Sequence, residues 1–215
     1  MARHRTVIER RDYELSPQVP AMALTGDNWR ISDKPSGIFH FHSSLEIGVC
    51  ESDSAVLGFP DTAFPITAGD VTVVSHGMLH TTYSTPGCQS KWSYIFSDPD
   101  KLLQFVTPQL SLQRIELFRN ALYNYRVVIH RDEIPLIHWL VEAIIREMSE
   151  QSPNYKIVVG GLYLSLMAKL VTIPSKAGSG SGDSATVLPI APALTYIEKN
   201  YAQRFQRSEL RSCAL

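Results

Sequence analysis

The chain has few of the features that mark exported, membrane-spanning or disulfide-rich proteins. Its 3 cysteines are widely spaced, and none belongs to a Cys-x-x-Cys pair of the kind found in zinc knuckles and redox dithiols. The basic residues near the N-terminus are not followed by the apolar run of a secretory signal. No window approaches the run of about 18 apolar residues that spans a bilayer. We therefore expect reduced thiols and a cytoplasmic protein.

A surplus of positive charge is also missing. The chain has 20 Lys and Arg residues against 21 Asp and Glu, so its formal net charge is −1. A domain that grips nucleic acid by itself usually carries a marked excess of Lys and Arg. The remaining composition, 44% hydrophobic and 19% charged, is that of an ordinary globular protein. At 215 residues, the chain fits one large domain or two small ones.

The first hundred residues have the pattern of a β-sandwich or barrel. Short apolar runs alternate with Gly, Pro, Asp and Ser, and none has the length and spacing of a helix. Residues 60–62 form the turn of a hairpin. The strands are expected at residues 45–49, 55–59, 63–66, 71–74, 81–84 and 91–96.

Aromatic residues are the candidates for lining a pocket in this β region. Trp92 and Tyr94 lie two residues apart on the last expected strand, so their side chains share one face with Phe96. Trp29 and Tyr83 complete the set of candidates. Each ring is either a pocket wall or part of the hydrophobic core, and the pattern leaves both alternatives open.

Two helices are expected after residue 99, where the apolar spacing changes from two to three or four. Residues 134–148 place their apolar side chains on one helical face. Residues 154–171 form a second helix with a broader apolar stripe. One side of that stripe would pack on the first helix. The other side either widens the same core or pairs with a second subunit, which predicts a homodimer through residues 134–171.

The end of the chain has the composition of a linker and a further helical segment. Residues 175–190 are rich in Gly and Ser at their start and are expected to be flexible. Beyond them, Leu194, Ile197 and Tyr201 form the apolar stripe of a short helix. We expect residues 191–215 to be the beginning of a domain rather than a whole one.

Three histidines and one glutamate form a candidate binding site. His40, His42 and Glu46 have the same parity, so on one extended strand their side chains would point to one face. Antiparallel pairing in a barrel would bring His80 opposite them. Imidazole and carboxylate groups suit Zn, Ni, Fe or Mn, and four such residues would leave coordination positions open. The alternative is a set of hydrogen-bonded pocket walls without a metal.

Two segments around these residues resemble the sequence motifs of the cupin superfamily. They are residues 39–46, FHFHSSLE, and residues 68–80, AGDVTVVSHGMLH. The order and spacing of Gly69, Asp70, Gly77 and His80 match the second motif. Ser75 and Ser84 depart from it, since they stand where proline and asparagine are usual. Catalytic cupins keep these positions more faithfully, so the departures weigh against an enzyme.

A third segment, residues 191–210 with the sequence APALTYIEKNYAQRFQRSEL, is similar to the start of the DNA-binding domain of AraC-type transcription regulators. Such regulators typically open with a cupin-like barrel, continue with two helices for dimerisation, and end with two helix-turn-helix units. The resemblance implies a mainly β fold with α: a double-stranded β-helix barrel over about 1–98 and two antiparallel helices within about 99–174. It also implies a linker over 175–190 and an incomplete helix-turn-helix domain over 191–215.

The resemblance implies an effector-sensing protein with no catalytic residues. A small molecule, for example a sugar, would bind His40, His42, Glu46, His80 and the aromatic candidates, with or without a divalent transition metal. DNA would be bound through the full-length regulator only, and we expect no sequence-specific DNA binding by this chain, which lacks the recognition helices. The alternative function is a metal-dependent cupin enzyme, an isomerase or dioxygenase, with the same four residues as ligands.

Overall fold

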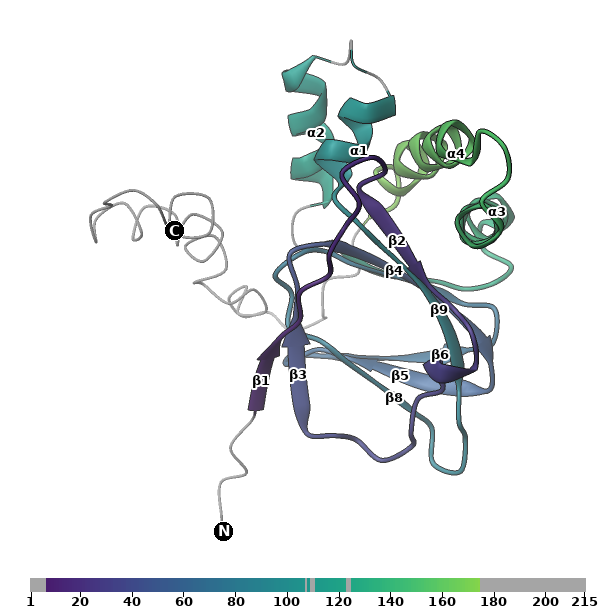
Figure 1. Ribbon diagram of the computed structural model, residues 1–215. Helices are drawn as coiled ribbons and strands as arrows, with labels where there is room; N and C mark the ends of the chain where they lie inside the picture. The colour runs from purple at the N-terminus through teal and green to yellow at the C-terminus, as the bar shows by residue number, and fades with distance from the viewer. Residues whose placement is uncertain (1–6, 107, 109–110, 123–124, 175–215) are drawn as a thin grey trace, which may run out of the picture.

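The structure is a computed structural model, and it describes residues 7–106, 108, 111–122 and 125–174. In this part of the chain there are ten β-strands, eight of which form a barrel-like pair of sheets, and four α-helices that all lie after residue 98 (Figure 1). The mainly β fold with helices expected from the sequence is therefore confirmed. The predicted linker at 175–190 and the helical segment at 191–215 lie outside the described residues.

Two sheets face each other across the barrel (Figure 1). The larger, antiparallel sheet has the spatial order β10 (Arg126–Ile129), β7 (Val71–Val74), β4 (Leu45–Ser52), β9 (Lys91–Ser97) and β2 (Ala21–Leu24). The smaller sheet has the order β6 (Ala63–Thr67), β5 (Ser54–Gly58) and β8 (Thr81–Ser84). A third ribbon at one side pairs β1 (Val7–Arg10) in parallel with β3 (Ile38–Phe41).

The central strand β4 divides the interior into two separate cores. Its odd-numbered residues from Leu45 to Val49 belong to one buried cluster, which includes the helices. Its even-numbered residues point the other way, and Cys50 packs with Trp92 and Tyr94 in a second cluster inside the barrel. This alternation is what a strand with period two must produce when both of its faces are covered.

The helices cover the outer face of the larger sheet (Figure 1). They are α1 (Pro99–Val106), α2 (Leu112–Leu122), α3 (Pro135–Glu150) and α4 (Tyr155–Leu170), and a 3-10 turn at Asp27–Trp29 lies earlier in the chain. Pro135 starts α3 at a position where its missing N–H costs nothing, and Gln151 ends it in the left-handed conformation. Among the described residues, no helix is long and apolar enough to cross a bilayer.

The strand and helix predictions agree with the structure, with two differences. The strands expected between residues 45 and 96 and both long helices are present. The strands β1, β2, β3 and β10 and the helices α1 and α2 were not predicted individually. The expectation that His40, His42 and Glu46 share one extended strand is wrong. His40 lies in β3 and Glu46 in β4, and the chain between them leaves one sheet for the other.

Candidate functional site

The four residues of the predicted site nevertheless meet inside the barrel. His40 and His80 form an isolated antiparallel bridge, in which each backbone N–H donates to the other residue's carbonyl oxygen at 2.9 Å. His42 follows β3 directly, and Glu46 points inward from β4. Their possible ligand atoms all lie within 4.8 Å of one another. We call His40, His42, Glu46 and His80 the barrel cluster.

The barrel cluster is shielded from solvent. His80 is 0% exposed, His42 1%, Glu46 3% and His40 8%. Polar side chains in such surroundings need partners, because each loses its hydration on burial. The partners here come from the backbone and from within the barrel cluster itself.

Backbone carbonyls fix the orientation of two imidazole rings. Nδ1 of His42 lies 2.8 Å from the carbonyl oxygen of Ser44, and Nδ1 of His80 lies 2.9 Å from that of Met78. A carbonyl oxygen only accepts hydrogen bonds, so Nδ1 carries the hydrogen in both rings. Carbonyl partners of this kind orient metal-binding histidines and set their tautomer.

The other nitrogen of each ring faces the same carboxylate oxygen. Nε2 of His42 lies 3.0 Å from Oε2 of Glu46, and Nε2 of His80 lies 3.3 Å from it. In a neutral ring with a hydrogen on Nδ1, Nε2 is a lone pair, and a lone pair repels a carboxylate oxygen. Each contact is favourable when a hydrogen lies between the two atoms, on Nε2 or on the carboxyl group, or when both atoms bind one cation.

Electrostatics keep Glu46 ionised and His40 neutral. Burial by itself raises the pKa of Glu46, but the charge of His80 and hydrogen bonds from His42 and His80 hold it well below its usual value. Burial, and secondly the neighbouring His80, lower the pKa of His40 to about 2. One carboxylate and one neutral imidazole with a free lone pair are thus available as ligands near neutral pH.

The donor set fits a divalent transition metal. Two ligands held about 2.1 Å from one ion are separated by roughly 3.0 Å at a right angle and 4.2 Å when opposite. The possible ligand atoms of the barrel cluster lie up to 4.8 Å apart, which is slightly wider, so a small inward movement of the side chains would bring them to coordination distance. Three imidazoles and a carboxylate suit Zn, Ni, Fe or Mn and leave positions for another ligand. The metal would hold and polarise an oxygen atom of that ligand.

Aromatic rings enclose the barrel cluster, and the most prominent of them was not predicted. Tyr13 stacks on Phe96 with ring centroids 3.7 Å apart and meets His42 edge-on at 5.6 Å. Burial, and secondly the charge of Glu46, raise the pKa of Tyr13 to about 12. On the other side, the ring of Phe59 lies 6.4 Å from that of His80. Nothing in the sequence around Tyr13 indicates that this N-terminal segment returns across the barrel.

Three of the predicted aromatic residues form a stack further along the barrel. Tyr94 stacks on Trp92 with centroids 5.5 Å apart, and Trp29 meets Tyr94 edge-on at 6.2 Å. The indole N–H of Trp92 donates to Ser90 Oγ. Phe96 connects this stack to the barrel cluster, since its ring lies 6.0 Å from Tyr94 and 5.3 Å from His42. Trp29, Trp92 and Tyr94 are therefore inner-barrel residues, and the polar group of Trp92 is already paired.

The structure does not bring Tyr83 to the barrel cluster. Its neighbour Ser84 points inward, where Ser84 Oγ contacts Ser90 Oγ at 2.7 Å beside Trp92. Successive side chains on a strand alternate between faces, so Tyr83 lies on the outer surface of β8. Which residues of a strand share a face follows from their spacing, but which of the two faces points inward depends on how the strand is placed in the sheet.

The comparisons with known proteins give low similarity. No protein-family model and no curated protein matches the chain. The solved structure of the AraC-like transcriptional activator CuxR is 14% identical with a TM-score of 0.46, and the alignment covers 80% of this chain and 57% of that one. For ToxT from Vibrio cholerae O395 the values are 6%, 0.47, 90% and 67%.

A metal-containing enzyme is also among the similar structures. Streptomyces albus HEPD, with its substrate 2-hydroxyethylphosphonate and Fe(II) bound, is 10% identical with a TM-score of 0.28, and the alignment covers 76% of this chain and 41% of that one. The chain thus spans 57% of the CuxR chain, the first of these structures. At such identities and TM-scores below 0.5, the likenesses settle neither the activity nor the site.

Proposed function

We propose that this chain is the effector-sensing part of a bacterial AraC-type transcription regulator that works in the cytoplasm. The observation that carries the proposal is the barrel cluster: four polar side chains are buried together between aromatic rings, and one of them, Glu46, extends from the inner face of the sheet whose outer face holds the helix pair. The cupin-like and AraC-like sequence motifs support it independently. A buried polar group is costly to keep, so its retention favours a binding role.

In this proposal, a small polar molecule binds at the barrel cluster, directly or through a divalent metal. A sugar fits the chemistry, because His and Glu side chains bond hydroxyl groups while the rings next to the barrel cluster, Tyr13, Phe59 and Phe96, provide apolar surface. Binding would favour one arrangement of barrel and helices over another. A coupling of about 1–3 kcal/mol would change DNA occupancy about 5- to 150-fold. The DNA contacts would belong to the helix-turn-helix domain that follows the linker.

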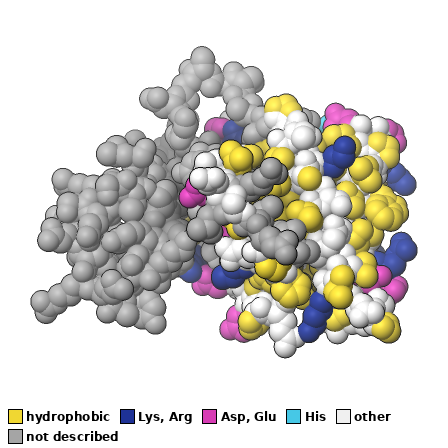
Figure 2. All heavy atoms as spheres, turned by 90° about the horizontal axis from the view of Figure 1, so that it is seen from above, with side chains coloured by type: hydrophobic (Ala, Val, Ile, Leu, Met, Phe, Trp, Pro, Cys, Tyr) yellow, Lys and Arg dark blue, Asp and Glu magenta, His cyan; other side chains and the backbone are white. Residues whose placement is uncertain are grey.

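We also propose a homodimer through α3 and α4. Figure 2 views the molecule from the helix side, where hydrophobic side chains gather at the surface. Trp139 is 58% exposed and Leu136 45% on α3, while Ile157 is 72% exposed on α4. Isolated exposed apolar residues are ordinary, but a contiguous group on two adjacent helices favours a protein interface.

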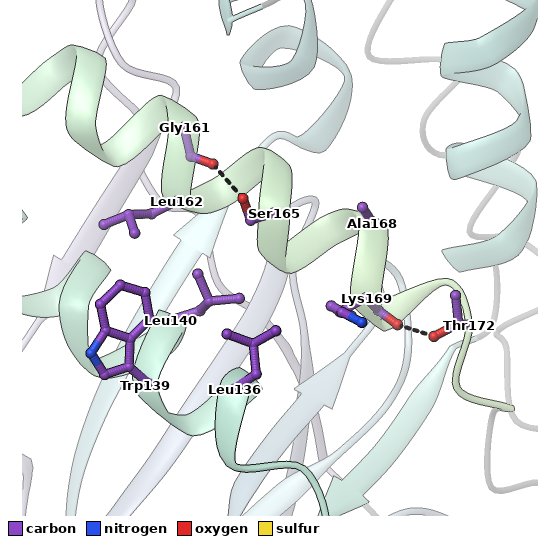
Figure 3. Close-up of a pocket in the computed structure, with 9 residues that line it drawn as sticks. All are labelled: Leu136, Trp139, Leu140, Gly161, Leu162, Ser165, Ala168, Lys169 and Thr172. Carbon is purple, nitrogen blue, oxygen red and sulfur yellow. Dashed lines mark hydrogen bonds between the residues drawn. The ribbon is translucent and has the colours of Figure 1, made fainter.

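A groove between the two helices fits a helix of a second subunit (Figure 3). Its walls are Leu136, Trp139 and Leu162, and small residues of α4 form its floor. Four exposed residues of α4 follow each other at intervals of three and four: Val158, Gly161, Ser165 and Ala168. That spacing keeps them on one stripe, and small side chains let a second helix approach closely. The opposite face of α4 is buried against the sheet.

The proposed function is tested by transcript profiling of a source strain that carries Glu46→Gln in the chromosomal gene. A regulator predicts that a small set of transcripts loses its response to the effector, with no other change of comparable size. His76→Gln, at an exposed loop position, is the matched control and should leave the profile unchanged. An unchanged profile in the Glu46→Gln strain, across growth on varied carbon sources, would contradict the proposal.

The second candidate is a metal-dependent cupin enzyme. The observation that favours it is the pair of backbone carbonyls that orient His42 and His80 toward one point, as in a metal centre. Metal alone does not distinguish the candidates, because a sensor can also use one. Turnover of a substrate that is lost in His42→Ala, together with an unchanged transcript profile, would establish the enzyme and remove the regulator.

A further inference from the structure

Two consecutive residues at the start of β10, Tyr125 and Arg126, extend to opposite sides of the larger sheet. Tyr125, just before the strand, belongs to the buried cluster under the helices. Arg126, its first residue, pairs in register with Val74, an inner-barrel residue, and points into the barrel. Both are nearly inaccessible, with 2% of Tyr125 and 5% of Arg126 exposed. A buried Arg is rare unless it is paired.

Arg126 binds the turn between β5 and β6. Its Nη1 and Nη2 donate to the two carboxylate oxygens of Asp61 at 2.7 and 2.6 Å, a two-pronged arrangement that fixes both groups. Its guanidinium carbon also lies 4.9 Å above the ring of Phe59. Since Asp61 and Phe59 belong to the smaller sheet's hairpin, Arg126 joins the two sheets at this end of the barrel.

This end of the barrel is where the barrel cluster lies. The ring of Phe59 lies near both Arg126 and His80. Its centroid is 4.9 Å from the guanidinium carbon of Arg126 and 6.4 Å from the ring centroid of His80. Glu46 and Arg126 both pair with Val74, one from each side, so the three residues form one row across β4, β7 and β10. Two strand spacings, roughly 10 Å, therefore separate the backbones of Glu46 and Arg126. A displacement of residues in the barrel cluster would therefore reach Arg126 through Phe59 and through Val74.

Tyr125 connects the same strand to the end of α4. Its hydroxyl donates to the carbonyl oxygen of Leu170, the last residue of the helix, at 2.9 Å. Its own carbonyl accepts the N–H of Ser75, which follows β7 directly. The carbonyl of Leu170 also accepts the N–H of Ile173 at 3.0 Å, so the hydroxyl of Tyr125 is a second donor that stabilises the final turn. The predicted linker begins a few residues later.

We propose that Tyr125 and Arg126 couple the barrel cluster to the last turn of α4. The inference rests on the proposed function insofar as the barrel cluster is the ligand site. Any event that shifts His80 or Glu46 changes the positions of the Phe59 and Arg126 side chains. The resulting movement of β10 strengthens or weakens the bond from Tyr125 to Leu170. The last turn of α4 is then the two-state element, either bonded and ordered or frayed.

Hydrogen exchange on the full chain tests this coupling without metal, effector or DNA. The measured amides are those of Val171, Thr172 and Ile173, which donate to the last turn of α4. Glu46→Gln perturbs the barrel cluster, and Asp61→Asn perturbs the partner of Arg126 at a side chain that is 37% exposed. We expect either change to alter exchange at these amides about fivefold or more.

The decisive comparison repeats both changes in a Tyr125→Phe background. We expect Tyr125→Phe to abolish most of the response, so that each second change adds less than about twofold. Tyr163→Phe is the matched control, because it also removes a buried hydroxyl from the packing of α4, but one bonded to Ser97 of β9. In that background the full response should persist.

An equal response with and without Tyr125 would overturn the coupling. So would the absence of any response at 171–173 to both Glu46→Gln and Asp61→Asn, with the fold checked by circular dichroism. If one variant does not fold, the other completes the comparison. Because the readout involves neither transcription nor turnover, a negative result leaves the proposed function standing, and a failed transcript test leaves the coupling standing.

Discussion

The two faces of the larger sheet differ in composition although they belong to the same strands. The outer face is apolar: Leu45, Ile47 and Val49 of β4 pack with α3 and α4 in a continuous hydrophobic core. The inner face of the same strand carries Glu46, where aromatic rings and three histidines surround a carboxylate. One strand thus serves two environments through its period of two.

Burial has opposite energetic effects on the two faces of the sheet. Apolar burial on the outer face stabilises the fold at about 25 cal/mol per Å². On the inner face, burial of a carboxylate and three imidazoles costs free energy that only partners recover. We therefore expect substitutions on the outer face to change stability alone, and substitutions in the barrel cluster to change binding as well.

The largest stability effect is expected on the outer face. Leu166→Ala removes a side chain of α4 that is 0% exposed, and should lower the free energy of unfolding by about 2–5 kcal/mol. Leu117→Ala, the matched control on α2, removes one that is 68% exposed and should cost less than about 0.5 kcal/mol. Urea denaturation measures both. Similar losses at the two positions would contradict the assignment of the core.

A smaller effect is expected from a methyl group added to the inner face. A Cβ at Gly48 would lie 2.7 Å from Thr72 Oγ1 and 2.9 Å from the ring of Tyr94. Gly48→Ala should therefore cost about 1–3 kcal/mol through overpacking and should displace Tyr94. Gly161→Ala, where a Cβ meets open space, is the control for the stability of the monomer, although Gly161 also lies in the groove of the proposed dimer. The two are compared by thermal unfolding, and an equally tolerated Gly48→Ala would show that the barrel interior is loosely packed.

The barrel cluster should also make stability depend on pH. His40 stays neutral in the folded protein, because its pKa is lowered to about 2, whereas in the unfolded chain it binds a proton below about pH 6.5. Its contribution is therefore present above pH 6.5 and is lost as the pH falls from there toward 2. With a chelator present, His40→Gln should reduce the loss of stability between pH 7 and pH 5 by about 1–2 kcal/mol. Equal losses in wild type and variant would argue against a buried neutral His40.

The smallest stability effect is expected at the exposed helix surface. Trp139→Ser should change the stability of the folded monomer by less than about 0.5 kcal/mol, because the ring is 58% exposed. The same change should dissociate the proposed dimer, which analytical ultracentrifugation detects as a halved mass. Phe105→Ser, at an exposed ring on α1, is the control and should leave the mass unchanged. A dimer that persists in Trp139→Ser would place the interface elsewhere.

Much of the fold could be predicted from local patterns, namely the spacing of apolar residues and the position of turn residues. The strands between 45 and 96 alternate apolar and polar residues between turn residues, and the helices at 135–150 and 155–170 have apolar spacings of three and four. The shared face of Trp92, Tyr94 and Phe96 follows from parity alone and is confirmed. The strand β10 is as long as β7 and β8, but it was missed because it follows two helices and lies outside the run of expected strands.

The candidate site was predictable in its residues but not in its construction. His40, His42, Glu46 and His80 were chosen by chemical type and spacing, and they do meet. The route by which they meet, across two strands and a backbone bridge between His40 and His80, depends on long-range pairing. Long-range pairing also explains why Tyr13 and Arg126 were missed. Each comes to this end of the barrel from a segment that is remote in the chain.

Native mass spectrometry of the freshly purified chain and of Glu46→Gln tests most directly whether the barrel cluster binds a ligand. The account predicts about one metal ion or one small molecule for each wild-type chain, and its loss from a folded Glu46→Gln protein. Cys88→Ser, which changes a partly exposed residue outside the barrel cluster, should retain it. The account would be contradicted if the wild-type chain bound neither added Zn, Ni, Fe or Mn ions nor a copurified molecule, so that its mass showed no bound ligand, as for Glu46→Gln.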